Sequence, residues 1–115
     1  MNKIPLNFDD SLLVGVEIEM ICFNSTQIYI HFNNQSFLVI ECSYYINSSL
    51  EIDLHNNKSE SFFIKLIGEK VNDITIDENR LNLTLHFSNT DTLTLINNEQ
   101  YESFTLNYPQ GKQIF

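Results

Sequence analysis

The first half of this chain is repeated in its second half. Gly15 corresponds to Gly68, and each glycine is followed by three apolar residues at successive spacings of three, three and two residues. After a loop that is two residues longer in the second copy, His31-Phe32 corresponds to His86-Phe87. A repeat of this length is one supersecondary unit, which cannot bury its hydrophobic face alone. The repeat therefore predicts two similar halves that share one core.

The length and composition are those of one domain. The chain has 115 residues, of which 43% are hydrophobic, so a core of ordinary size is available. It contains three glycines and two prolines, and no stretch has the composition of a linker. We therefore predict a single domain over residues 1–115, in which the two repeats span about 8–56 and 59–108.

Strands are predicted from the spacing of apolar residues. Apolar and polar residues alternate over 81–87, which is the period of a half-buried strand, and again over 92–96 after a turn. The first half repeats this pair of strands over 28–32 and 37–41. The spacing of three and then two residues that opens each half does not fit a flat strand. It predicts a β-bulge at the same place in both copies.

Each half is predicted to begin with a short helix that ends at a glycine. In the second half this helix spans about 59–67, because Gly68 can take the left-handed conformation that ends helices. In the first half a weaker turn precedes Gly15, and a fourth strand at 50–54 is expected to match 104–108. The sequence therefore predicts a mostly β (α+β) fold. Two pseudo-repeated antiparallel halves form a sandwich or a partly open barrel, with one or two short helices.

The two halves differ in the side chains that face away from the core. Those of the second half are polar and suit contact with water, whereas those of the first half are apolar and aromatic, which is typical of a partner-binding face. The helix predicted at 59–67 could instead cover this face inside the monomer, and the sequence leaves both alternatives open. The outward residues are Tyr29, His31, Phe37, Val39 and Glu41, followed by Tyr44 and Tyr45, in the first half, and Asn82, Thr84, His86, Thr92 and Thr94 in the second.

The chain is strongly acidic. Fifteen acidic residues against six basic ones give a formal net charge of −9, and no cation lies between Lys3 and Lys58. Such a chain repels phosphate, which argues against binding to nucleic acids and to anionic membranes. A cationic protein partner is favoured, because opposite fields speed encounter and reject wrong partners. Solubility alone is the plain alternative explanation of the same charge.

No motif in the sequence supports catalysis, a cofactor or a metal ion. The three glycines are too scattered to cradle a phosphate, and neither cysteine has a neighbouring histidine or a second cysteine at metal-binding spacing. The carboxylate pairs Glu17/Glu19 and Glu51/Asp53 are common on solvated strands. We therefore expect no enzyme activity, no catalytic residue, no cofactor and no metal site.

The sequence also favours a cytoplasmic location. Asp9 and Asp10 interrupt any apolar run near the N-terminus, so that segment does not have the pattern of a secretory signal. No stretch reaches the roughly 18 apolar residues that a membrane-spanning helix needs. Cys22 and Cys42 fit unpaired thiols in a reducing compartment better than a disulfide framework.

The second half carries a recognisable pattern of residues. It begins with Leu-x-Gly-x-x-Val-x-x-Ile over 66–74, continues with Leu-x-Leu-x-Phe-Ser-Asn-x-Asp-x-Leu-x-Leu over 83–95, and ends with Tyr-Glu-Ser-Phe over 101–104. This pattern resembles a family of small bacterial β-rich domains of unknown biochemical role. In size and acidity the chain also resembles the immunity proteins of contact-dependent and polymorphic toxin systems, which bind and block a cognate toxin domain, often a nuclease. That second resemblance is one of class, so it assigns no functional residue.

We therefore predict a non-enzymatic acidic binding protein, most plausibly an immunity protein that docks on the active-site region of a cationic, nuclease-type toxin. Carboxylates held on rigid strands would occupy the basic site that otherwise holds phosphate, and aromatic side chains would anchor the contact. A small-ligand-binding domain and a homo-oligomeric structural domain, such as a homodimer, stay as alternatives. The residues predicted to contact the partner are Glu17, Glu19, Glu41, Glu51 and Asp53 as the charged part and Tyr29, Tyr44 and Tyr45 as the anchors.

Overall fold

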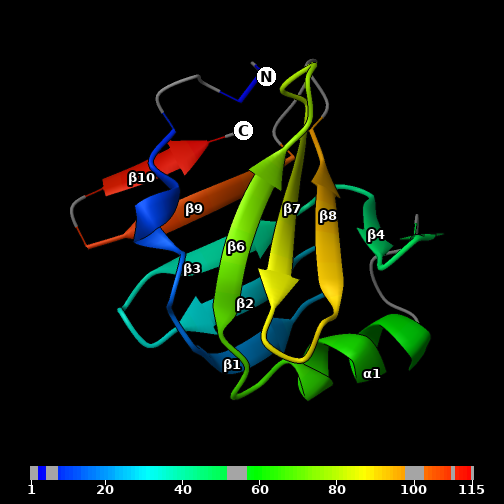
Figure 1. Cartoon of the computed structure of the whole chain (residues 1–115). Helices are drawn as coiled ribbons and strands as arrows, with labels where there is room; N and C mark the ends of the chain where they lie inside the picture. Colours follow the sequence, from blue (N-terminus) through cyan, green and yellow to red (C-terminus); the bar gives the residue numbers. More distant parts are fainter. Residues whose placement is uncertain (1–2, 5–7, 52–56, 98–102, 110, 115) are drawn as a thin grey trace.

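The computed structural model describes residues 3–4, 8–51, 57–97, 103–109 and 111–114. Within these ranges the chain forms two five-stranded antiparallel sheets, a 3-10 turn and an α-helix (Figure 1). The elements, in chain order, are η1 (Asp10–Leu12), β1 (Ile18–Phe23), β2 (Ile28–Phe32), β3 (Phe37–Ile40), β4 (Tyr44–Ile46), β5 (Ser49–Glu51), α1 (Asn57–Lys65), β6 (Val71–Ile76), β7 (Asn82–Phe87), β8 (Thr92–Ile96), β9 (Phe104–Tyr108) and β10 (Gly111–Ile114).

The two halves exchange strands. The first sheet has the order β1-β2-β3-β9-β10, and the second sheet has the order β5-β4-β8-β7-β6, so the last two strands of each half join the sheet of the other half. In Figure 1, β6, β7 and β8 run steeply in front of β1, β2 and β3, which cross behind them. The predicted mostly β, α+β fold is confirmed. The described strands form a sandwich-like pair of sheets and do not close into a barrel.

The predicted β-bulge is present in both copies. The pairing of β1 with β2 shifts register between Ile18 and Met20, and the pairing of β6 with β7 shifts between Val71 and Asp73. In each case one extra residue on the first strand reverses the faces to which the following side chains point. This explains why apolar residues at a spacing of three, followed by two, all reach the core.

The start of β1 and the start of β6 bind each other reciprocally. The backbone N–H of Gly15 donates to the carbonyl of Val71 at 2.7 Å, and the N–H of Gly68 donates to the carbonyl of Ile18 at 2.8 Å. Both glycines have a positive φ, +89° and +91°, which other residues rarely adopt. Because the repeat equates these two pairs of residues, the two halves are related by an approximate twofold axis at this junction.

Helix α1 closes one end of the sandwich (Figure 1). Phe63 is fully buried, and its ring lies edge-on to Tyr44 with centroids 5.5 Å apart and to Phe23 at 6.2 Å. Phe23 and Tyr44 face the space between the sheets, so α1 packs on inward-facing side chains. The helix predicted at 59–67 is therefore present, shifted by two residues, whereas its counterpart before Gly15 is only the single turn η1.

The predicted correspondence of the fourth strands is wrong. Phe104 in β9 pairs with Ile40, and Tyr44 in β4 pairs with Leu95, which is the counterpart of Ile40 in the repeat. The strand that matches β9 is therefore β4 and not the segment at 50–54, of which 52–54 lie outside the described residues. Apolar and polar residues alternate over 50–54 in the sequence as they do in β9. The pairing of strands within the sheets shows which strands correspond.

Candidate functional site

The outer face of the first sheet carries a cluster of aromatic and apolar side chains, which we call the aromatic face. In one row across the sheet, Cys22 pairs with Tyr29 and Tyr29 pairs with Val39. In the next row, Met20 pairs with His31 and His31 pairs with Phe37. Strands β1, β2 and β3 thus bring together residues that are up to 19 positions apart in the chain. The aromatic face consists of Met20, Cys22, Tyr29, His31, Phe37 and Val39.

Three rings of the aromatic face stack on one another. The ring centroids of His31 and Phe37 are 5.2 Å apart, and those of Tyr29 and His31 are 6.2 Å apart with an angle of only 12° between the planes. The hydroxyl of Tyr29 donates to the side-chain oxygen of Gln27 at 2.8 Å. Rings that are fixed in this way have little rotamer freedom left to lose when they bind a partner.

The aromatic face is accessible at its three rings and at Met20, whereas Val39 is buried at 8% exposure. Met20 is 47% exposed at the β1 edge, and Tyr29, His31 and Phe37 are half-buried. Within the described part of the chain, α1 packs against inward-facing residues such as Phe23, so it does not cover this face. Of the two alternatives that the sequence left open, coverage by the helix is therefore not found in the described part of the chain.

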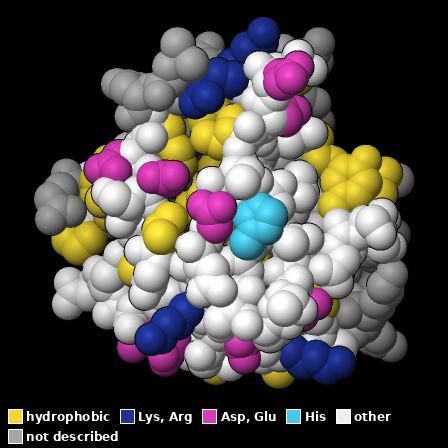
Figure 2. All heavy atoms as spheres, viewed as in Figure 1, with side chains coloured by type: hydrophobic (Ala, Val, Ile, Leu, Met, Phe, Trp, Pro, Cys, Tyr) yellow, Lys and Arg dark blue, Asp and Glu magenta, His cyan; other side chains and the backbone are white. Residues whose placement is uncertain are grey.

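The corresponding face of the second sheet is polar. The hydroxyls of Thr84 and Thr94 are 2.8 Å apart, and the hydroxyl of Thr75 lies 2.9 Å from the ring nitrogen Nε2 of His86. Figure 2 views the molecule from this side, and the surface over β7 and β8 is largely free of hydrophobic side chains. The two sheets therefore share their strand pattern but differ in the polarity of their outer faces, because Thr84 stands at the repeat position that corresponds to Tyr29.

The three predicted aromatic anchors lie in three different environments. Tyr29 belongs to the aromatic face and is half-buried. Tyr45 is half-buried on the outer face of the second sheet, where it pairs with Thr94 and Leu50. Tyr44 is 0% exposed and packs against Phe63, so the prediction that it anchors a partner is wrong for this structure. Neighbouring residues on a strand face opposite sides, so only one of Tyr44 and Tyr45 can face out.

The predicted carboxylates do not form one plate. Glu19 lies at the bulge of β1, whereas Glu41 directly follows β3 at the opposite end of the same sheet, where its N–H donates to the carbonyl of Ser103 at 2.9 Å. Glu17 pairs with Lys70 at the junction of the two halves. Glu51 ends β5 in the second sheet, and Asp53 lies outside the described residues. Among the described residues, Glu19 and Glu41 border the aromatic face at its two ends, whereas the backbone of Glu51 belongs to the other sheet.

Two kinds of reactive centre, a metal site and an ionised thiol at Cys42, are not found among the described residues. No group of three or more His, Cys, Asp or Glu side chains among them could hold a metal ion. Burial raises the pKa of the Cys42 thiol to about 12, and a hydrogen bond with the backbone of Ile96 offsets this only in part. A protonated thiol is a poor nucleophile. In the described ranges, no helix has the length and apolar character that crossing a bilayer requires.

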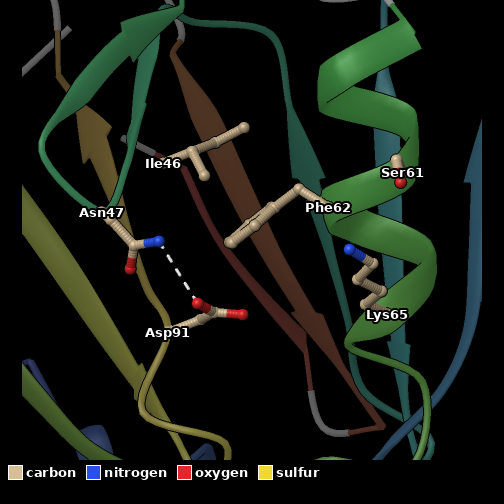
Figure 3. Close-up of a pocket in the computed structure, with 6 residues that line it drawn as sticks. All are labelled: Ile46, Asn47, Ser61, Phe62, Lys65 and Asp91. Atoms are coloured by element: carbon tan, nitrogen blue, oxygen red, sulfur yellow. Dashed lines mark hydrogen bonds between the residues drawn. The ribbon is translucent and has the colours of Figure 1, made fainter.

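A hollow between α1 and the ends of β4 and β8 is a second feature of the surface (Figure 3). Its volume is about 350 Å³. No motif in the sequence predicts this hollow, because its lining comes from three separate segments. The only available hint was the repeat itself, which places Asp91 opposite an uncharged serine. The lining residues are Ile46, Asn47, Ser61, Phe62, Lys65 and Asp91.

Comparison with known proteins gave no relative. No family model, no curated protein and no solved structure matches the chain.

Proposed function

We propose that this protein is a non-enzymatic binding protein that docks on a cationic protein partner through the aromatic face. The observation that carries this proposal is the half-exposed stack of Tyr29, His31 and Phe37. On the second sheet, threonines stand at the positions that correspond to Tyr29 and Phe37. The repeated fold does not require aromatic rings at the positions of Tyr29 and Phe37, because the second sheet forms without them. The presence of these two rings on one sheet alone supports a role outside the monomer.

The aromatic face has the properties of a binding hot spot. Large aromatic side chains bury roughly 150–250 Å² each and dominate interface energetics. Tyrosine is enriched among interface residues whose replacement by alanine costs about 2 kcal/mol or more of binding free energy. Tyr29 is already held by Gln27, so a partner that covers it pays little in lost side-chain entropy.

The negative charge of the protein favours a partner with a positively charged surface. The formal net charge of −9 attracts a cationic surface over a distance of about one Debye length, roughly 8–10 Å in ordinary salt. Glu19 and Glu41, which are both exposed, supply negative charge at the two ends of the aromatic face. Rim charges of this kind mainly raise the association rate, whereas the rings supply affinity.

The most specific form of the proposal is an immunity protein that neutralises a nuclease-type toxin in the bacterial cytoplasm. Nuclease active sites are basic because they hold phosphates, so an acidic protein competes with the substrate for the same surface. The small size, the acidity and the class resemblance support this form. It assigns no enzymatic step to the protein itself.

The test is a binding experiment with the product of the gene immediately upstream. We expect that product to bind the protein, to lose its own activity in the complex, and to associate more slowly as salt is raised. The double variant Tyr29→Thr/Phe37→Thr places on the first sheet the residues found on the second, and it should weaken binding at least about 30-fold. The matched control, Thr84→Ala/Thr92→Ala, changes the pseudo-equivalent positions of the second sheet and should leave affinity unchanged.

Two results would overturn the proposal. One is an unchanged affinity in the aromatic-face double variant while the control variant loses binding. The other is a protein that ignores the upstream product and sediments as a stable dimer, which the same double variant dissociates. The second result would assign the aromatic face to a homodimer instead.

A further inference from the structure

The hollow beside α1 combines opposite charges with an apolar floor. Lys65 extends from α1 on one wall, and Asp91 reaches in from the start of β8 on the other (Figure 3). The ring of Phe62 lies between them, and Ile46 completes the floor. Phe62 is only 9% exposed, so the floor is part of the core. Among the six lining residues, Figure 3 draws one hydrogen bond, from Asn47 to Asp91.

The carboxylate of Asp91 is held in place from two sides. The side-chain amide of Asn47 donates to its Oδ1 at 3.2 Å, and the side-chain amide of Asn89 donates to its Oδ2 at 2.9 Å. Asn47 is itself fixed, because it exchanges two hydrogen bonds of 2.9 Å with the backbone of Thr92 and has a φ of +56°. Each carboxylate oxygen keeps a further lone pair, so Asp91 can accept a hydrogen bond from a ligand in a fixed direction.

The twofold relation of the halves shows that these charges belong to one corner only. Asp91 and its counterpart Ser36 end equivalent turns. The N–H of Asp91 donates to the side-chain oxygen of Asn89 at 3.0 Å, and the N–H of Ser36 donates to that of Asn34 at 3.1 Å. Ser36 is 1% exposed and carries no charge. The counterpart of Lys65 is Leu12, which packs against the core. The charged pair Asp91 and Lys65 therefore occurs at only one of the two equivalent corners.

We propose that the hollow binds a free α-amino acid with an apolar side chain. The ammonium group of the ligand donates to Asp91, and its carboxylate accepts from Lys65 and from the hydroxyl of Ser61. The apolar side chain covers Phe62 and Ile46. A volume of about 350 Å³ lies at the lower end of the range for small-molecule sites, which suits a ligand of this size. This inference is independent of the aromatic face, which lies on the other sheet.

The test is a titration of the whole protein with L-leucine and L-phenylalanine, followed through backbone amide chemical shifts. The expected result is saturable binding at millimolar or lower concentration, with shifts confined to residues around Asn47, Ser61 and Asp91. Leucinamide lacks the carboxylate and 4-methylpentanoate lacks the ammonium group. Each should bind at least tenfold more weakly than leucine if both charges of the hollow take part.

Variants identify the two charged contacts. Lys65→Gln changes an exposed helix position and should weaken leucine binding at least tenfold while leaving the affinity for leucinamide unchanged. Asp91→Asn should weaken leucine binding and spare 4-methylpentanoate. Lys112→Gln, in β10, is the matched control and should change neither. The proposal is overturned if neither amino acid shifts the amides around the hollow, or if Lys65→Gln binds leucine as tightly as the unchanged protein, which would make Lys65 and Asp91 surface charges only.

Discussion

The pH dependence of stability tests how tightly the crossover between the sheets is packed. Cys42 lies between β3 and β4, where the chain passes from the first sheet to the second, and burial raises the pKa of its thiol from an ordinary 9.0 to about 12. The unfolded thiol therefore releases its proton at a lower pH than the folded one. Stability from this group is complete below pH 9 and is lost as pH rises toward 12.

The size of the effect follows from these two pKa values. Ionisation of the unfolded thiol lowers the free energy of unfolding by about 1.4 kcal/mol at pH 10 and by about 2.7 kcal/mol at pH 11, relative to pH 7. Tyrosines and lysines titrate in the same range, so the measurement is a difference between the protein and its Cys42→Ala variant. Urea unfolding at a series of pH values gives that difference. Relative to pH 7, the free energy of unfolding of the variant should fall by about 1.4 kcal/mol less than that of the protein at pH 10, and by about 2.7 kcal/mol less at pH 11.

A parallel loss of stability in the two proteins above pH 9 would refute the reasoning. It would mean that the thiol of Cys42 reaches water in the folded state, since only a desolvated thiol keeps its proton at that pH. The half-buried Cys22 offers an internal comparison, because a thiol reagent should modify it well before it modifies Cys42.

Two further predictions concern stability. Phe63→Ala removes a fully buried ring and should cost about 3–5 kcal/mol in urea unfolding, whereas Ile64→Ala, on the same helix and 56% exposed, should cost less than about 0.5 kcal/mol. A similar cost for both would show that α1 is not docked as described. Gly15→Ala and Gly68→Ala should each cost about 1–2 kcal/mol of unfolding free energy, because both glycines have a positive φ that alanine rarely adopts. An added Cβ would meet no atom within 4 Å, so no steric clash adds to this cost. A clearly unequal cost would argue against the approximate twofold relation.

Local features of the fold could be predicted from the sequence. The spacing of Ile18, Ile21 and Phe23 places the bulge, because only an extra residue brings side chains at those positions to one face. The alternation around Tyr29 and Phe37 likewise gives the outer face of the first sheet. Both are properties of one strand and its immediate neighbour, so a local pattern contains them.

The exchange of strands between the halves could not be predicted. Tyr44 begins β4, whose alternation is the same whichever sheet it joins, so the pattern left open which of Tyr44 and Tyr45 faces the core. The grouping of the carboxylates could not be predicted for the same reason, since Glu41 follows β3 in the first sheet and Glu51 ends β5 in the second, although they lie ten residues apart in the chain. The hollow at Asp91 depends on contacts between segments that are distant in sequence, which no local pattern records.

Hydroxyl-radical footprinting of the complex with the upstream gene product is the most direct test of the central claim. Aromatic rings and methionine react readily when solvent reaches them, and both outer faces carry such residues. The account predicts that Met20, Tyr29 and Phe37 lose most of their oxidation on binding, whereas Tyr45 on the second sheet keeps its own. Protection of Tyr45 with unchanged oxidation of Tyr29 and Phe37 would contradict it.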